Sequence, residues 1–367
     1  MLKVKNGIII ELIVYINICG GNKLSNLRFK NLGDIREYIN SKIDENHPIV
    51  KSLYHNKLIV FVGAGLSIHL GVPGWSQFAS KYVELIKDGN INYKTANDLK
   101  NIADKKKILS LCRCIAKTNK IDESPITDWF DIKEEELSSS EIYKMLYSLN
   151  AIYITTNYDN ALDLMSQNKK EEQVNIVTDF ETSIEKKQDE KKVYYNVNEL
   201  VYENIMKSGN VIHIHGSKNE LNSMVISNED YIKRYGYNIS SYSNDKNHKI
   251  YSDFLKDVFN SEYTILFIGY GLEEIEILQY MFESTIDNNR NNMNNRFMLL
   301  GGYASDYGYI DILSQYYYHN YGVTILPYDI TQEGYDKEIE MFLSKLNYWK
   351  DNRYGRLKAD LELLEDI

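Results

Sequence analysis

One pattern recurs four times in this 367-residue chain: an apolar, largely β-branched run ends abruptly in small or polar residues, and helical periodicity follows. The four runs lie at residues 58–62, 151–155, 263–268 and 297–302, and further strands are expected at 211–216 and 323–329. Strands that alternate with helices predict a mostly parallel sheet with helices on both faces. We therefore predict an α/β fold, a Rossmann-like doubly wound sheet with helical insertions.

The segments between these runs differ in character. Residues 88–148 are polar, have helical periodicity and carry no strand signal, so we expect a helical insertion there. Residues 167–210 contain EKKQDEKK and are interpreted as a solvated excursion, and residues 287–295 as a surface loop. The tail, 336–367, is predicted to be helical because four apolar residues recur at helical spacing: Ile339, Phe342, Leu343 and Leu346.

Charge and cysteine content exclude several functions. The formal net charge of −10 argues against direct nucleic-acid binding through a broad surface. Cys19, Cys112 and Cys114 are too few for a disulfide framework or a four-thiolate zinc site, which favours reduced thiols and a cytoplasmic location.

The N-terminal segment, residues 1–21, has two lysines ahead of an apolar run, as a signal peptide does. Glu11 interrupts that run, no small-residue cleavage site follows, and the run is too short to cross a bilayer. We expect no membrane association. The Ile and Val content favours a β-strand that packs on the body or on another subunit.

The first strand leads directly into Gly63-Ala64-Gly65, which begins like a dinucleotide fingerprint. The third glycine of that fingerprint is replaced by Ile68, and no acidic residue closes a second strand about 20 positions later. Gly-Lys-Ser/Thr is also missing, so both a Rossmann dehydrogenase and a P-loop NTPase fit poorly. A tight strand-to-helix turn without a ligand remains the alternative.

Two further motifs follow predicted strands. Thr155-Thr156-Asn157-Tyr158-Asp159 can cap a helix or contribute to a site. In His213-Ile214-His215-Gly216, strand alternation places both histidines on one face, and Gly216 is expected to leave room for something to approach His215. We expect His213 to be a buried, hydrogen-bonded histidine, and we expect no metal because no carboxylate or thiolate completes a ligand set.

Taken in order, GAGLS, TTNYD, HG and GYGLE resemble the sirtuin family over about residues 58–328. The resemblance implies an NAD pocket whose first loop lines the pyrophosphate and ribose with Gly63, Ala64, Gly65 and Ser67. It implies that Thr156 lies in the pocket, that Asn157 holds the ribose or an attacking water, and that Asp159 accepts a hydrogen bond from the nicotinamide carboxamide. His215 would be the general base. The resemblance also implies that the adenosine ribose contacts Gly269, Tyr270 and Gly271, and that Tyr328 lies near the adenine.

The chain also departs from the sirtuin deacylases. They carry four cysteines in a zinc module after the HG motif, whereas this chain has no cysteine after Cys114. Where they have a GIPDFR-like segment, residues 71–78 read GVPGWSQF. These departures predict that the zinc module is absent and argue against protein deacylation.

The remaining motifs resemble the sirtuin-like NAD hydrolases of bacterial anti-phage defence, for which NAD+ is the substrate. Stand-alone chains of this size resemble the subunits that assemble with HerA-type ATPases, which implies a gated homo-oligomer with an ATPase partner. Two alternatives remain open: a sirtuin-type ADP-ribosyl transferase or deacylase, and a non-catalytic NAD- or ADP-ribose-binding scaffold subunit. The implied division is an N-terminal extension at 1–50 with an oligomer contact, a sirtuin-like catalytic domain at 51–335, and a C-terminal helical segment at 336–367.

Overall fold

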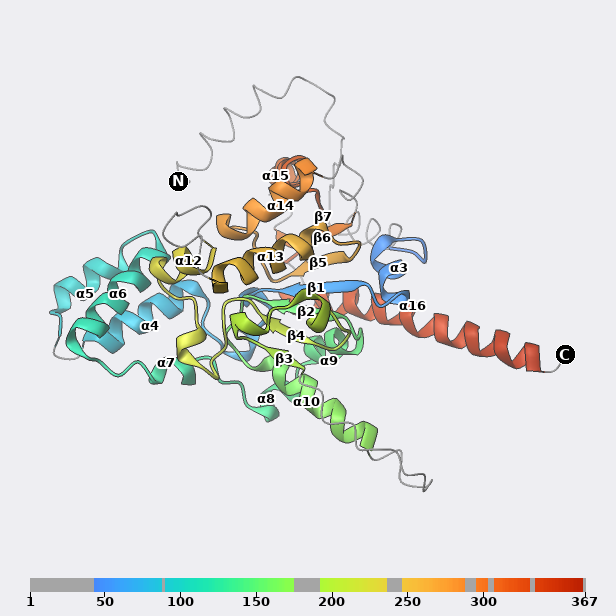
Figure 1. Ribbon diagram of the computed structural model, residues 1–367, viewed down its shortest axis with the longest axis horizontal. Coiled ribbons are helices and arrows are strands. Elements are labelled where there is room, and N and C mark those ends of the chain that lie inside the picture. The colour runs from blue at the N-terminus through green and yellow to red at the C-terminus, as the bar shows by residue number, and fades with distance from the viewer. Residues whose placement is uncertain are drawn as a thin grey trace, which may run out of the picture.

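A seven-stranded parallel sheet forms the centre of the molecule (Figure 1). The computed structural model describes residues 43–87, 90–174, 192–235, 246–287, 295–302, 307–330 and 334–365. The strands are β1 Leu58–Val62, β2 Ile152–Thr155, β3 Val193–Tyr194, β4 Val211–His213, β5 Thr264–Ile268, β6 Arg296–Gly302 and β7 Val323–Asp329. Their order in the sheet is β3-β4-β2-β1-β5-β6-β7, and the predicted doubly wound α/β fold is confirmed.

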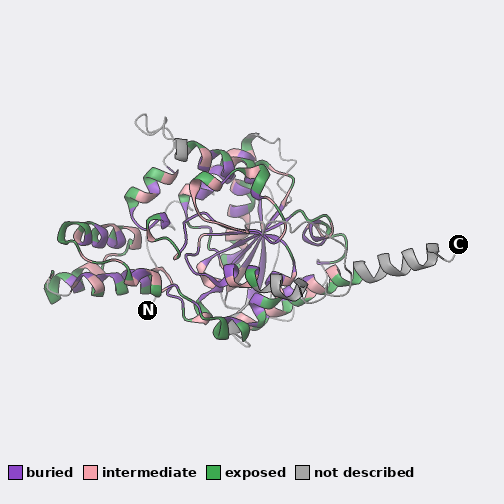
Figure 2. Ribbon diagram, turned by 60° about the horizontal axis from the view of Figure 1, so that its bottom comes forward, coloured by how far each residue is buried: buried purple, intermediate pink, exposed green. Residues whose placement is uncertain are grey.

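Helices cover both faces of this sheet. On one face pack α3 Pro48–Tyr54, α4 Trp75–Lys87, α9 Glu141–Ser148, α10 Ala161–Val174 and α16 Gly334–Glu365. On the other pack α11 Tyr202–Ile205, α12 Asn228–Tyr235, α13 Lys246–Asn260, α14 Ile275–Asp287 and α15 Tyr307–Tyr321. Alternate residues of each strand face opposite layers, so Val60 packs on the first and Phe61 on the second, and both are fully buried. Figure 2 shows the central strands in the colour of buried residues. Burial on both faces explains why the central strands are continuous apolar runs.

The predicted helical insertion consists of α5 Tyr93–Lys100, α6 Lys105–Asn119, α7 Pro125–Asp128, α8 Glu134–Ser138 and α9. In α6 the buried residues Ile108, Leu109, Cys112 and Ala116 lie on the side that joins the core on the first face. The Asp104 carboxylate accepts a hydrogen bond from the Lys107 amide and caps the start of α6. Helices α4, α5 and α6 form a group at the left of the view in Figure 1.

The interpretation of residues 167–210 as a solvated excursion was wrong in part. The segment contains β3, which pairs with β4 at the edge of the sheet, and α11, whose Ile205 is buried. The strand has only two residues, both half-buried, so the sequence contains no apolar run that would predict it. Residues 175–191 lie outside the described part of the chain, as do the predicted N-terminal strand and residues 288–294 of the predicted loop.

The C-terminal prediction is confirmed, because α16 buries Ile339, Phe342, Leu343 and Leu346. Among the helices that the structure describes, none combines the length and apolarity needed to cross a bilayer.

The strand order determines where a ligand can bind. Strands β2, β3 and β4, which follow β1 in the chain, lie on one side of it in the spatial order β2-β4-β3, and β5, β6 and β7 lie on the other side. The loops that follow β1 and β5 therefore lie next to each other at the topological switch point. In open parallel sheets this crevice, beyond the carboxyl ends of the strands, is the usual ligand site.

Candidate active site

A cavity of about 460 Å³ lies at this switch point. Its lining comes from the loop after β1 with the start of α4, from residues 156–159 after β2, from His215 after β4, and from the loop after β5. Phe130 of the helical insertion completes one wall. The cavity thus brings together nine of the residues singled out in the sequence: Ala64, Gly65, Thr156, Asn157, Asp159, His215, Gly269, Tyr270 and Gly271.

The loops after β1 and β5 pack backbone against backbone. The Gly65 amide donates to the Gly269 carbonyl at 2.9 Å, and the Gly63 amide to the Ile268 carbonyl at 3.0 Å. A Cβ atom on Gly63 would lie 2.5 Å from the Gly269 carbonyl oxygen, and Gly269 itself has a φ of +65°. Gly63 therefore supports the cavity from behind and is not among its lining residues, whereas Ala64 and Gly65 are. Its predicted contact with a pyrophosphate stays a prediction.

Asn157 presents one polar atom to the cavity. The Thr155 hydroxyl donates to the Val62 carbonyl and accepts a hydrogen bond from the Asn157 amide, which fixes this loop to the end of β1. The Asn157 Nδ2 donates to Ser67 Oγ at 3.0 Å, and Ser67 Oγ lies 2.7 Å from Tyr143 Oη. Ser67 is fully buried beneath the cavity and does not line it. The Asn157 Oδ1 is buried without a hydrogen-bond partner among the described residues.

Asp159 both caps a helix and lines the cavity. Its Oδ1 accepts a hydrogen bond from the Ala161 amide at the start of α10. Burial raises the pKa of Asp159, against hydrogen bonds from Ser67 and Ala161 that lower it. The helix-capping alternative and the site prediction are therefore compatible.

The two histidines do not share a face, so that expectation was wrong. Strand β4 ends at His213, and the turn that follows directs His215 to the opposite layer. The ring nitrogens of His213 lie 2.9 Å from the Asn157 carbonyl oxygen and 2.7 Å from Asp163 Oδ1 on α10. The predicted buried, hydrogen-bonded role of His213 is confirmed.

His215 lies against Tyr231 and Tyr235 of α12, with ring centroids 5.4 and 5.7 Å apart. Both of its ring nitrogens are buried and have no hydrogen-bond partner among the described residues. Burial, together with the positive charges of Arg234 and Lys106, lowers the pKa of His215 well below its usual range. A neutral imidazole of this kind can accept a proton from a bound hydroxyl group or water.

Contrary to the prediction, Gly216 does not leave room for a ligand beside His215 but allows a tight turn against Ser223. It has a φ of +80°, and a Cβ atom on it would lie 2.1 Å from the Ser223 carbonyl oxygen. The space beside Gly216 is filled by the Ser223 backbone and does not admit a ligand. Arg234 secures the same turn by donating to the Ile214 and Ser223 carbonyls at 3.1 and 3.0 Å.

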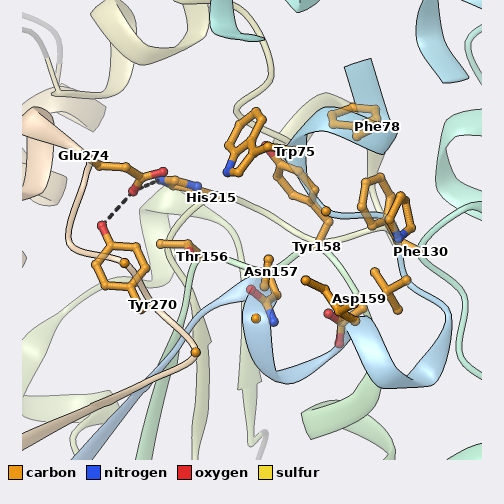
Figure 3. Close-up of a pocket in the computed structure, with 18 of the residues that line it drawn as sticks. Trp75, Phe78, Phe130, Thr156, Asn157, Tyr158, Asp159, His215, Tyr270 and Glu274 are labelled. Atoms are coloured by element: carbon orange, nitrogen blue, oxygen red, sulfur yellow. Dashed lines mark hydrogen bonds and ion pairs between the residues drawn. The ribbon is translucent and has the colours of Figure 1, made fainter. Parts of the chain in front are cut away.

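One wall of the cavity is aromatic, formed by Trp75, Phe78, Phe130 and Tyr158 (Figure 3). The ring centroid of Phe130 lies 5.1 Å from those of Phe78 and Tyr158. The loop that carries Phe130 is held by Asn160, whose Oδ1 accepts from the Ile132 amide at 2.8 Å. Sequence reasoning did not assign these residues to the site. Trp75 and Phe78 do belong to the GVPGWSQF stretch that departs from the deacylases.

Glu274, at the start of α14, was also not predicted. Its carboxyl group lines the cavity and accepts hydrogen bonds from the Tyr270 hydroxyl at 2.8 Å and the Tyr231 hydroxyl at 3.2 Å. Tyr270, predicted to meet the adenosine, lines the cavity and packs its ring on Phe61 with centroids 4.8 Å apart. Burial raises the pKa of Glu274 to about 7, against the Tyr270 hydrogen bond and the charge of Lys106, which lower it.

Tyr328 lies outside this arrangement. It is buried in the core on β7 and closely approaches Gly301, where an added Cβ would lie 2.8 Å from Tyr328 Cζ. Tyr328 is not among the described residues that line the cavity, and its predicted place near the adenine stays a prediction. Within the described ranges, no group of three or more His, Cys, Asp or Glu side chains is arranged to hold a metal ion.

Comparison with known protein families identifies a SIR2-like domain. Residues 151–326, just under half of the chain, match the SIR2-like domain family. The match begins at β2 and includes the loops that carry Asn157, His215 and Glu274. No curated protein matches the chain. The SIR2-like domain supports a sirtuin-like family and fits an NAD-dependent enzyme.

Proposed function

We propose that this chain, whose residues 151–326 carry a SIR2-like domain, hydrolyses NAD+ to nicotinamide and ADP-ribose. We further propose that the reaction is gated, and that it acts in anti-phage defence by depleting NAD+ within an oligomer that an ATPase partner controls. NAD+ is then a substrate and not a resident cofactor.

One observation carries the proposal: three polar atoms of Asn157 and His215, two residues that line the cavity, are buried without a hydrogen-bond partner among the described residues. They are Asn157 Oδ1 and the two ring nitrogens of His215. A buried polar atom left unpaired costs about 1–3 kcal/mol. A bound polar ligand can supply the hydrogen bonds that Asn157 Oδ1 and one ring nitrogen of His215 lack, while the other ring nitrogen, Nε2, lies 3.6 Å from Glu274 Oε2.

The rest of the cavity suits the parts of NAD+. The flat faces of Trp75 and Tyr158 offer an apolar wall for a planar ring such as nicotinamide. The loop after β1 brings the backbone of Ala64 and Gly65 to the cavity surface, as a pyrophosphate requires.

The proposed chemistry uses few groups. The bond between nicotinamide and ribose C1′ breaks, the electron pair goes to the nicotinamide nitrogen, and C1′ becomes oxocarbenium-like. Water then bonds to C1′ and its proton passes to His215 before release to solvent. Asn157 Oδ1 accepts a hydrogen bond from the water or from a ribose hydroxyl and so holds it in place. Nicotinamide leaves as a neutral molecule, so a strong general acid is not required.

The test is to follow nicotinamide and ADP-ribose released from NAD+ by the purified protein, alone and with the products of its neighbouring genes. His215→Ala and Asn157→Ala should each lower kcat by roughly 10²–10⁴-fold because they remove the base and the positioning amide. His319→Ala, an exposed histidine on α15, serves as the matched control and should keep the wild-type rate. Full activity in His215→Ala would refute the assignment of the base, and inactivity of the wild type in every assembly would refute the hydrolase.

The gating proposal follows from the consequence of the reaction. An unrestrained NAD+ hydrolase kills the cell that makes it, so activity must depend on a signal or a partner. The resemblance to subunits that assemble with HerA-type ATPases supports a partner in trans. An ATPase gene beside this one, and co-purification of its product, would support the assembly.

A further inference from the structure

We infer that Glu274 is a positioning residue for His215: its carboxyl group faces the imidazole and stabilises the proton that His215 takes up. The catalytic meaning of this pairing rests on the proposed NAD+ hydrolysis. Glu274 Oε2 lies 3.6 Å from His215 Nε2, across one corner of the cavity (Figure 3). This separation exceeds a hydrogen bond but is short enough for an ion pair between an imidazolium and a carboxylate.

Two tyrosines orient the carboxyl group. Tyr270 Oη donates to Oε2 at 2.8 Å, and Tyr231 Oη donates to Oε1 at 3.2 Å. The Glu274 backbone is anchored independently, because its carbonyl accepts from the Ile277 and Leu278 amides at the start of α14. The side chain is therefore held against His215 by the hydroxyls of two different elements, α12 and the loop after β5. The Glu274 side chain is buried.

The charges around the pair come from several elements. Lys106 of α6 lies with its Nζ 3.9 Å from the Tyr231 ring centroid and forms an ion pair with Glu276 at 2.8 Å. Lys106 lowers the pKa of both Glu274 and His215, and Arg234 of α12 lowers that of His215. Other titratable groups near the pair are Tyr158, Tyr235, Tyr251 and Glu276.

The pairing gives the carboxyl group a role in the proton transfer. When the attacking water transfers its proton to His215, the ring becomes an imidazolium next to the Glu274 carboxylate. The opposite charges attract, which lowers the free energy of the transition state that leads to the imidazolium. The proton then leaves to solvent and the pair returns to its starting state. Because burial raises the pKa of Glu274 to about 7, this support is present above neutral pH and absent below it.

The pairing is tested first through catalysis, with Glu274→Gln and Glu274→Asp. Gln keeps the shape and can still accept a tyrosine hydrogen bond, but it carries no charge. We expect kcat of Glu274→Gln to fall by roughly 10–100-fold with KM for NAD+ within about threefold, because the change acts on proton transfer and not on binding. The rise of kcat through pH 7 should flatten in Glu274→Gln and be partly restored in Glu274→Asp.

The matched control is Glu283→Gln, which removes a half-buried carboxylate further along α14 that does not line the cavity. Its kcat and pH profile should equal those of the wild type. A Glu274→Gln variant with the wild-type kcat and an unchanged pH profile would overturn the inference.

A second measurement separates this inference from the proposed function because it needs no turnover. In protein labelled with ¹⁵N-histidine, the ring signals of His215 are assigned by their loss in His215→Ala and followed against pH. We expect an inflection near pH 7 that persists in Glu283→Gln and disappears in Glu274→Gln. An inflection that survives in Glu274→Gln would overturn the pairing. Absence of nicotinamide release together with a Glu274-dependent inflection would refute the hydrolase and leave the pairing standing.

Discussion

His213 and His215 are two residues apart, yet their surroundings favour opposite protonation states. Both nitrogens of His213 face acceptors, the Asn157 carbonyl and the Asp163 carboxylate, so both must carry a proton. Burial alone would lower the pKa of His213, but Asp163 and the Asn157 carbonyl outweigh it and the pKa is raised. No such acceptor is bonded to His215 within the described ranges, and its pKa is lowered. The first histidine holds Asn157 in place, and the second is available as a base.

At the same scale, Glu274 should make the folded state sensitive to pH. Its pKa rises from 4.5 to about 7 on folding, so the folded protein binds this proton more tightly than the unfolded chain. The stabilisation is complete below pH 4.5 and is lost as pH rises through 7. Over this window the free energy of unfolding of Glu274→Gln should therefore gain roughly 3 kcal/mol relative to wild type, at about 1.4 kcal/mol per pKa unit.

Urea unfolding of the two proteins at pH 4.5, 6 and 8 measures that gain. Glu283→Gln, for which no such change is expected, provides the reference. A difference between Glu274→Gln and wild type that stays constant with pH would show that the carboxyl group is not held in an unfavourable environment. A stability cost at the pH where the carboxylate supports catalysis is a common property of active sites.

At the scale of elements, the site depends on how closely the loops after β1 and β5 pack. Gly63→Ala would place a Cβ 2.5 Å from the Gly269 carbonyl oxygen and from Tyr270 Cα, both of which belong to the backbone and cannot rotate away. We expect the free energy of unfolding to fall by about 1–3 kcal/mol, and NAD+ turnover to fall with it because the cavity floor shifts.

The control for this substitution is Gly308→Ala on α15. A Cβ at Gly308 meets no heavy atom within 4 Å, so stability should stay the same or rise by up to about 1 kcal/mol. Thermal unfolding of both variants beside wild type makes the comparison. Equal melting temperatures for Gly63→Ala and wild type would contradict the close packing of the two loops.

The elements also show how far the sequence could predict this protein. Strands buried on both faces are continuous apolar runs, so β1, β2, β5, β6 and β7 could be recognised, and with them the loops that follow. The two-residue strand β3 carries no such pattern. Phe130 reaches the cavity only through the tertiary packing of an insertion. In the sequence, Glu274 looks like any acidic residue at the start of a helix. Its place in the site could not be predicted, because Tyr231 and Tyr270 orient its side chain through tertiary contacts.

At the scale of the whole molecule, the described residues that line the cavity come from the switch point of the sheet and from the helical insertion. The cavity thus lies between loops from both sides of the sheet, and near it Arg113 of α6 forms an ion pair with Asp230 of α12 at 3.1 Å. A partner that displaces the insertion would alter Phe130 and Lys106 together. We propose that the ATPase partner acts on the site through these contacts.

The central claim is that the protein breaks NAD+ with water. Mass spectrometry of the products formed in H₂¹⁸O tests it most directly, with the protein alone and in its assembled form, and with unlabelled ADP-ribose incubated in parallel to correct for exchange. We predict one nicotinamide for each ADP-ribose, with one ¹⁸O atom on C1′, and loss of both products in His215→Ala. ADP-ribose attached to an acceptor, an O-acyl ester, or intact NAD+ under every condition would contradict the claim.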